Sequence, residues 1–185
     1  MIEDTLLDAE DRMDKAVTAL ANTLDTIRTG RASTALVEHL HVTHYGQPMA
    51  LNQLATLAAP EATLITVTPW DAGTVNTIMK AIQTSDLGIN PNNDGVVIRL
   101  NFPPLTEERR KEYVKVVKHM AEEGRVAVRN IRRDARKHLE AAEKAGAISA
   151  DELERAEKEM EKITHDHVDH IDKALGRKEQ ELLEV

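Results

Sequence analysis

The chain has 185 residues, of which 41% are hydrophobic and 30% charged, and 32 Asp and Glu against 24 Lys and Arg give it a formal net charge of −8. This is the composition of a soluble globular protein with one domain or two small ones, and the lack of cysteine excludes disulfides, cysteine-based zinc sites and a thiol nucleophile. The acidic N-terminus is unlike a signal peptide and no apolar run approaches the ~20 residues that cross a bilayer, so we expect a cytoplasmic protein without membrane segments.

Residues 1–29 predict one long helix, because Leu6, Met13, Leu20 and Ile27 recur every seven residues and Gly30 can end it. The next residues, 31–104, predict a small α+β unit. Its expected elements are β-branched strands at 36–45, 63–70 and 96–102, a turn at 46–48, and a short helix from Asp71 to about residue 86.

Two further long helices follow. Thr106 can cap the first, which should run to about Ala145 before Gly146 stops it. Ser149 and Glu152 have the spacing of a capping box, which predicts the start of the last helix. The apolar stripe of that helix contains Leu153, Ala156, Met160, Ile163, His167, Ile171 and Ala174.

None of the three long amphipathic helices would be stable alone, so they should form one bundle. We therefore predict an α+β fold with two domains: an elongated antiparallel three-helix bundle of residues 1–30 and 105–185, and an inserted β/α/β domain of residues 31–104. A helix of about 39 residues would be ~58 Å long.

Positive charge is concentrated on one helix. Residues 107–145 carry 12 basic and 8 acidic residues, and Arg125, Arg129, Arg132 and Arg136 are spaced to form a narrow stripe with Arg133 at its edge. We expect this stripe on the solvent face. Two interpretations have equal weight: the arginines pair with the neighbouring acidic helices, or they bind phosphates of a folded RNA, for which arginine is well suited.

Five segments of the sequence are similar to one known family. They are IRTGRAS (27–33), YGQPMALNQLA (45–55), SDLGINPNNDG (85–95), PPLTEERRKE (103–112) and RVAVRNIRRDA (125–135). Together they resemble the bacterial ribosome recycling factors over essentially the whole chain. The resemblance implies the two-domain α+β fold above in an L-shaped, tRNA-like arrangement.

The resemblance also implies a function. Such a factor binds the ribosome after termination and, with elongation factor G and GTP, splits it into subunits and releases mRNA and tRNA. By motif match, the residues expected to bind large-subunit rRNA are Arg132, Arg129, Arg110, Arg133 and Arg28. The expected hinge between the domains comprises Gly30, Arg31, Ala32, Pro103, Pro104 and Leu105. No enzymatic activity, cofactor or metal is expected, and the chain should act as a monomer.

Two other functions remain open at this point. The acidic helices could make the chain a protein-binding adaptor without RNA affinity. The histidines of HLHVTH (39–44) and HDHVDH (165–170) could form a metal-dependent enzyme, although we expect them on the solvated surface. Gly124 inside a helix should cost ~1 kcal/mol relative to Ala, and either close packing or bending would explain it.

Overall fold

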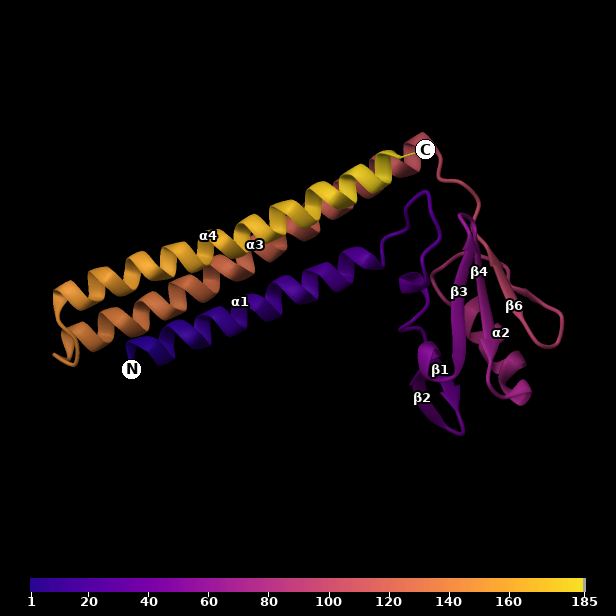
Figure 1. Cartoon of the computed structure of the whole chain (residues 1–185), viewed down its shortest axis with the longest axis horizontal. Coiled ribbons are helices and arrows are strands. Elements are labelled where there is room, and N and C mark those ends of the chain that lie inside the picture. Colours follow the sequence, from indigo (N-terminus) through magenta and orange to yellow (C-terminus); the bar gives the residue numbers. More distant parts are fainter. Residues whose placement is uncertain (185) are drawn as a thin grey trace. The chain divides into compact units, whose positions relative to one another are not determined.

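The computed structural model describes residues 1–184, which form two compact units (Figure 1). One contains residues 1–24 and 112–180, and the other contains residues 25–111 with the C-terminal residues from 181. The first unit is helical, and the second combines short strands with one helix. The predicted α+β fold class is therefore confirmed. No helix in the described part of the chain is long and apolar enough to cross a membrane.

Three long helices form the first unit: α1 (Ile2–Asp25), α3 (Glu107–Lys144) and α4 (Ala150–Leu183) (Figure 1). Each follows the apolar periodicity of its sequence. The buried side chains include Ala9, Met13 and Leu20 of α1, Val117, Val128, Ile131 and Leu139 of α3, and Ala156, Met160 and Ile171 of α4. α1 ends earlier than predicted, at Asp25. The β-branched residues that follow have low helix propensity.

The connections of α3 and α4 match their sequence signals. Thr106 Oγ1 accepts a hydrogen bond from the Arg109 amide at 3.1 Å. Gly146 has φ +74, and the Ala147 amide donates to the Ala142 carbonyl, as in the turn that commonly ends helices at glycine. Ser149 and Glu152 then exchange two hydrogen bonds, at 2.8 and 3.2 Å, which confirms the predicted capping box.

Gly124 lies where the three helices approach one another closely. A Cβ atom at this position would lie 3.0 Å from Cδ2 of Leu20 on α1 and 3.5 Å from Cδ1 of Ile171 on α4. These distances leave little room for a side chain. Of the two explanations open from the sequence, the structure supports close packing.

The second unit contains two antiparallel sheets. β1 (His41–His44) and β2 (Gln47–Ala50) form a hairpin, and β3 (Ala55–Glu61), β4 (Leu64–Pro69), β6 (Ile98–Asn101) and β5 (Asn92–Asn93) form a four-stranded sheet in that order. The helix α2 (Val75–Gln83) completes the unit (Figure 1). Buried apolar side chains of both sheets and α2 form one core, which includes Val42, Ile65, Val67, Ile78, Ile82, Ile98 and Leu100.

The sequence predicted this unit less completely than the bundle. The strands expected at 63–70 and 96–102 are present with shorter bounds, as is the short helix. The strand expected at 36–45 was wrong in its first half, because a 3₁₀ turn at Thr34–Leu36 and turn residues 37–39 come before β1. The expected turn at 46–48 overlaps the start of β2, and β3 was missed. Its sequence, ATLAAPE, is rich in alanine and contains proline, both of which are depleted in strands.

Candidate functional site

The arginine stripe of Arg125, Arg129, Arg132 and Arg136 lies along α3 beside α4. Only part of it faces solvent. The side chain of Arg125 is 19% exposed, that of Arg132 is 37% and that of Arg129 is 47%. The expectation of a solvent face was therefore wrong for Arg125. Periodicity gave the direction of the stripe relative to the apolar core, but it did not show how closely the neighbouring helix approaches.

Arg125 is held by carboxylates from two helices. Its Nε donates to Asp172 Oδ1 at 2.8 Å, and its Nη1 donates to Glu122 Oε2 at 3.0 Å. Burial lowers the pKa of the guanidinium, but the hydrogen bonds and charges of the two carboxylates outweigh burial and raise it. The other oxygen of Glu122 accepts from Nη1 of Arg129 at 3.3 Å, so that Glu122 connects two members of the stripe.

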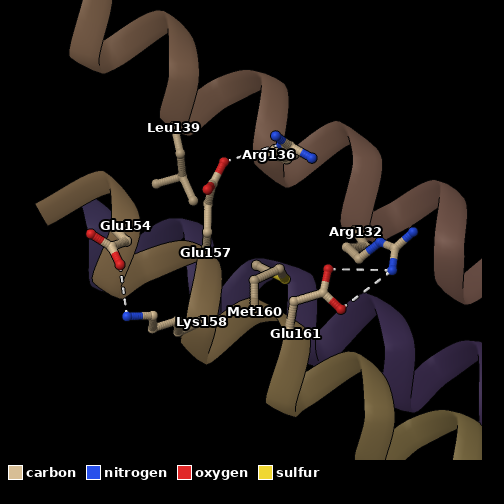
Figure 2. A pocket seen from close by; sticks show the side chains of 8 residues that line it. All are labelled: Arg132, Arg136, Leu139, Glu154, Glu157, Lys158, Met160 and Glu161. Carbon is tan, nitrogen blue, oxygen red and sulfur yellow. Dashed lines mark hydrogen bonds and ion pairs between the residues drawn. The ribbon is translucent and has the colours of Figure 1, made fainter. Parts of the chain in front are cut away.

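Arg132 and Arg136 line a groove of about 360 Å³ between α3 and α4 (Figure 2). Nη1 of Arg132 donates to Glu161 of α4 at 3.3 Å. Nε of Arg136 lies 2.9 Å from Glu140 and 3.1 Å from Glu157, and these carboxylates, Glu157 foremost, raise its pKa. The groove is also lined by Leu139, Glu154, Lys158 and Met160. Within the structure, the stripe is therefore paired as the first interpretation supposed.

Two further cations of α3, Arg133 and Lys137, lie outside the stripe and differ from it in being unpaired in the described part of the chain. Arg133 and Lys137 are exposed, and neither has an ion pair with any residue the structure describes. Asp134 between them instead pairs with Arg12 of α1 at 3.3 Å. Arg133 is thus an exposed predicted site residue that no carboxylate in the described part of the chain engages.

The two remaining predicted arginines, Arg110 and Arg28, lie among the residues of the smaller unit. Arg110 is half-buried, and its Nε is buried without a hydrogen-bond partner in the described part of the chain. Arg28 donates from Nη2 to the carbonyl of Pro103, and its guanidinium lies 5.5 Å from the ring centroid of Phe102. Arg28, two residues before the predicted hinge segment Gly30–Ala32, therefore contacts Pro103 of the other predicted hinge segment.

The histidines differ from their expected placement at one position. His39, His41, His165 and His170 are exposed and His44 is partly buried, but His167 is buried at 5% exposure. Its place in the apolar stripe of the last helix was the sequence signal for this burial. Among residues 1–184, no three His, Cys, Asp or Glu side chains are grouped so that they could hold a metal ion.

Comparison with known proteins identifies the family. The sequence model of the family described as Ribosome recycling factor matches residues 20–183. The ribosome-recycling factor of Acidothermus cellulolyticus is 51% identical over 185 residues, and that of Oleidesulfovibrio alaskensis is 49% identical over 184, with both chains covered fully in each case. The chain belongs to the ribosome recycling factor family.

Solved structures of the family have the same fold. A solution structure of a ribosome recycling factor is 42% identical with a TM-score of 0.81 and covers 100% of this chain and 98% of its own. A second structure holds the T. thermophilus ribosome recycling factor and the E. coli elongation factor G bound to the E. coli post-termination complex. It is 44% identical, with a TM-score of 0.71 and full coverage of both chains.

Family membership decides between the functions left open by the sequence. Ribosome recycling factors are translation factors without catalytic activity, so the expectation that the chain is not an enzyme is confirmed and the metal-dependent enzyme is rejected. Membership also favours ribosome recycling over the protein-binding adaptor.

Proposed function

We propose that this chain binds the ribosome after termination and, with elongation factor G and GTP, splits it into subunits and so releases mRNA and tRNA. The observation that carries this proposal is similarity along the whole chain, at 44% identity, to a factor bound with elongation factor G to a post-termination complex. The chemistry, hydrolysis of GTP, belongs to elongation factor G. This chain acts mechanically, as a monomer.

We further propose that α3 anchors the chain on large-subunit rRNA. Arg132 and Arg129 are the principal contacts, because both are partly exposed and keep guanidinium nitrogens that have no partner in the described part of the chain. Exposed Arg133 adds a further charge beside them. Arg110 and Arg28 contribute less, since one is half-buried and the other is engaged with Pro103 and Phe102.

The anchor is tested by sedimentation with isolated large ribosomal subunits at low salt. The wild type should co-sediment, and the double variant Arg129→Ala/Arg132→Ala should bind at least tenfold more weakly with its helix content intact by circular dichroism. A matched control removes two exposed cations from α4, Lys158→Ala/Lys173→Ala, whose partners lie one turn away on the same helix. Equal loss in the control would assign the effect to net charge and not to the stripe.

We also propose that the bundle of residues 1–30 and 105–185 and the inserted domain of residues 31–104 move relative to each other about Gly30–Ala32 and Pro103–Leu105. Because the chain has no cysteine, a disulfide engineered between these two segments would be the only one. The oxidised protein should bind ribosomes without splitting them, and reduction should restore splitting with elongation factor G. Splitting by the oxidised protein would refute the hinge.

A further inference from the structure

We propose that Glu122 and Glu161 determine the selectivity of the arginine stripe. They hold Arg129 and Arg132 in place and lower the affinity of the stripe for polyanions in general, so that only a rigid RNA surface with correctly placed phosphates binds well. This inference rests on the proposed function, and it assigns to two acidic residues a role in choosing the RNA.

The first argument is charge. The four arginines of the stripe lie within ion-pair distance of five carboxylates: Glu122, Glu140, Glu157, Glu161 and Asp172. The stripe is therefore neutralised by its surroundings, although its sequence is strongly basic. A phosphate that approaches at random meets carboxylates as well as guanidinium groups, and like charges brought together at an interface disfavour the wrong partner.

The second argument is how each guanidinium is occupied. Arg125 bonds its two carboxylates through Nε, Nη1 and Nη2 and is mostly buried, so it has little capacity left. Arg129 and Arg132 each use Nη1 alone. A guanidinium carries five N–H donors in a planar fork, so each of these two keeps donors for a phosphate while a carboxylate holds it on the other side.

The third argument is orientation. An arginine side chain loses considerable rotamer freedom when it is fixed on a ligand. Glu161 of α4 pairs with Arg132, and Glu122 accepts from Arg129 through Oε1 and from Arg125 through Oε2. The carboxylates thus limit where the two guanidiniums point before RNA arrives. A rigid surface that matches this placement can keep the ion pairs, whereas a mismatched polyanion must displace them.

The test compares two anions. Glu122→Gln and Glu161→Gln keep the side-chain shape and remove the charge, and each variant is measured against poly(U), a flexible polyanion, and against isolated large ribosomal subunits at the same salt. Each substitution should raise the affinity for poly(U) by on the order of two- to fivefold, the range for an exposed ion pair. Affinity for the subunit should stay the same or fall, so the ratio of the two affinities should decrease.

Glu154→Gln is the matched control. Glu154 lies on α4 and lines the same groove, but it pairs with Lys158 at 2.7 Å and not with the stripe (Figure 2). Its substitution removes the same charge and should change poly(U) binding less than Glu161→Gln does. Equal effects of the two substitutions, or an unchanged ratio of affinities in both stripe variants, would overturn the inference.

The same experiment separates this inference from the proposed function. Wild-type binding to large subunits that requires Arg129 and Arg132, combined with an unchanged affinity ratio in the glutamine variants, would leave the rRNA anchor standing and refute only the role of the two glutamates. No wild-type binding to large subunits at low salt would overturn both.

Discussion

His167 of α4, which is buried in the helical bundle, is hydrogen-bonded to Asp14 of α1, whose side chain is 66% exposed. Its Nε2 lies 2.6 Å from Asp14 Oδ1, and its Nδ1 lies 2.7 Å from the carbonyl oxygen of Ile163. A carbonyl and a carboxylate are both acceptors, so these two contacts favour the protonated imidazole, in which both ring nitrogens donate, although the residue is only 5% exposed. Burial lowers the pKa of His167, but these hydrogen bonds and the charges of Asp14 and Glu10 outweigh it and raise the pKa.

This raised pKa predicts that the bundle is stabilised by protonation. A group whose pKa is higher in the folded than in the unfolded state contributes its full stabilisation below the unfolded value, about 6.5, and loses it as the pH rises through the folded value. The difference in free energy of unfolding between wild type and His167→Gln should therefore be larger at pH 6 than at pH 8.5. Urea unfolding followed by circular dichroism at 222 nm measures it.

The exposed His165 on the same helix supplies the control. The substitution His165→Gln should leave the pH dependence of stability close to that of the wild type. A His167→Gln variant whose loss of stability is the same at both pH values, or greater at pH 8.5, would show that His167 is neutral in the folded protein.

Gly124 and Gly176 should respond in opposite ways to an added side chain. Both lie inside helices, but a Cβ at Gly124 meets Leu20 at 3.0 Å while nothing lies within 4 Å of one at Gly176. Gly176→Ala should therefore stabilise the protein by about 0.5–1 kcal/mol through helix propensity. Gly124→Val should destabilise it by about 1–3 kcal/mol, because the side chain overpacks the contact of three helices.

Urea unfolding followed at 222 nm gives both values for these glycine variants. Gly124→Ala is an intermediate case. The gain in helix propensity opposes the contact of the new methyl group with Cδ2 of Leu20, which a small shift of the Leu20 side chain can relieve. The stability of this variant should therefore lie within about 1 kcal/mol of that of the wild type. Stabilisation by Gly124→Val would show that the three helices can separate at this point without cost.

The bounds of the long helices could be predicted from the sequence, because helix starts and ends depend on residues that are neighbours along the chain. Apolar periodicity and the capping residues Thr106 and Ser149 predicted α3 and α4 to within one or two residues. The close approach at Gly124 and the ion pair of Arg125 with Asp172 depend on which residues of another helix lie opposite, and no local pattern specifies them. β3 was missed for a related reason: its alanines and Pro60 have poor strand propensity, and pairing with β4 stabilises it.

The burial of His167 is another feature that local sequence patterns predict only in part. The spacing of His167 placed it correctly among the apolar residues of α4, whereas its residue type suggested a solvated surface. The deciding partner, Asp14, is 153 positions away in the sequence. A buried polar group is tolerated when it is hydrogen-bonded, and only the packed bundle shows that this condition is met.

Arg125 and Arg133 are predicted to have separable roles. Arg125 is mostly buried between two carboxylates, so Arg125→Ala should destabilise the bundle by about 1.5–3 kcal/mol, the range for hydrogen bonds to charged groups. Arg133 is exposed and has no ion pair in the described part of the chain, so Arg133→Ala should change stability by less than about 0.5 kcal/mol. Urea unfolding of the two variants checks this contrast.

In ribosome binding, Arg133→Ala should have the larger effect and Arg125→Ala the smaller one, the reverse of their effects on stability. Arg133→Ala should weaken co-sedimentation with large subunits, and the slope of log affinity against log salt should fall by about 0.7–0.9, as expected when one phosphate contact is lost. Arg125→Ala, assayed below its unfolding range, should leave that slope unchanged. A stable Arg125→Ala protein with a reduced slope would mean that Arg125 leaves its carboxylates to bind RNA.

The turn between β1 and β2 contains a strained residue that a substitution should relieve. Tyr45 and Gly46 both have positive φ, +48 and +77, in a two-residue hairpin connection closed by His44 and Gln47. This conformation favours Asn-Gly, and it costs an ordinary L-residue about 1–2 kcal/mol. Tyr45 is 89% exposed, and in the described part of the chain its ring contacts only that of His44. Tyr45→Asn should therefore stabilise the smaller unit by about 0.5–1 kcal/mol.

Trp70 provides the measurement, because it is the only tryptophan and lies in the smaller unit, where its Nε1 donates to Thr56 Oγ1 at 2.9 Å. Urea unfolding followed by its fluorescence reports on this unit separately from the helices. Gly46→Ala is the opposite control: nothing lies within 4 Å of its added Cβ, so its destabilisation of about 1 kcal/mol would come from the backbone. If Tyr45→Asn lowers the midpoint instead, the contact with His44 outweighs the strain of the turn.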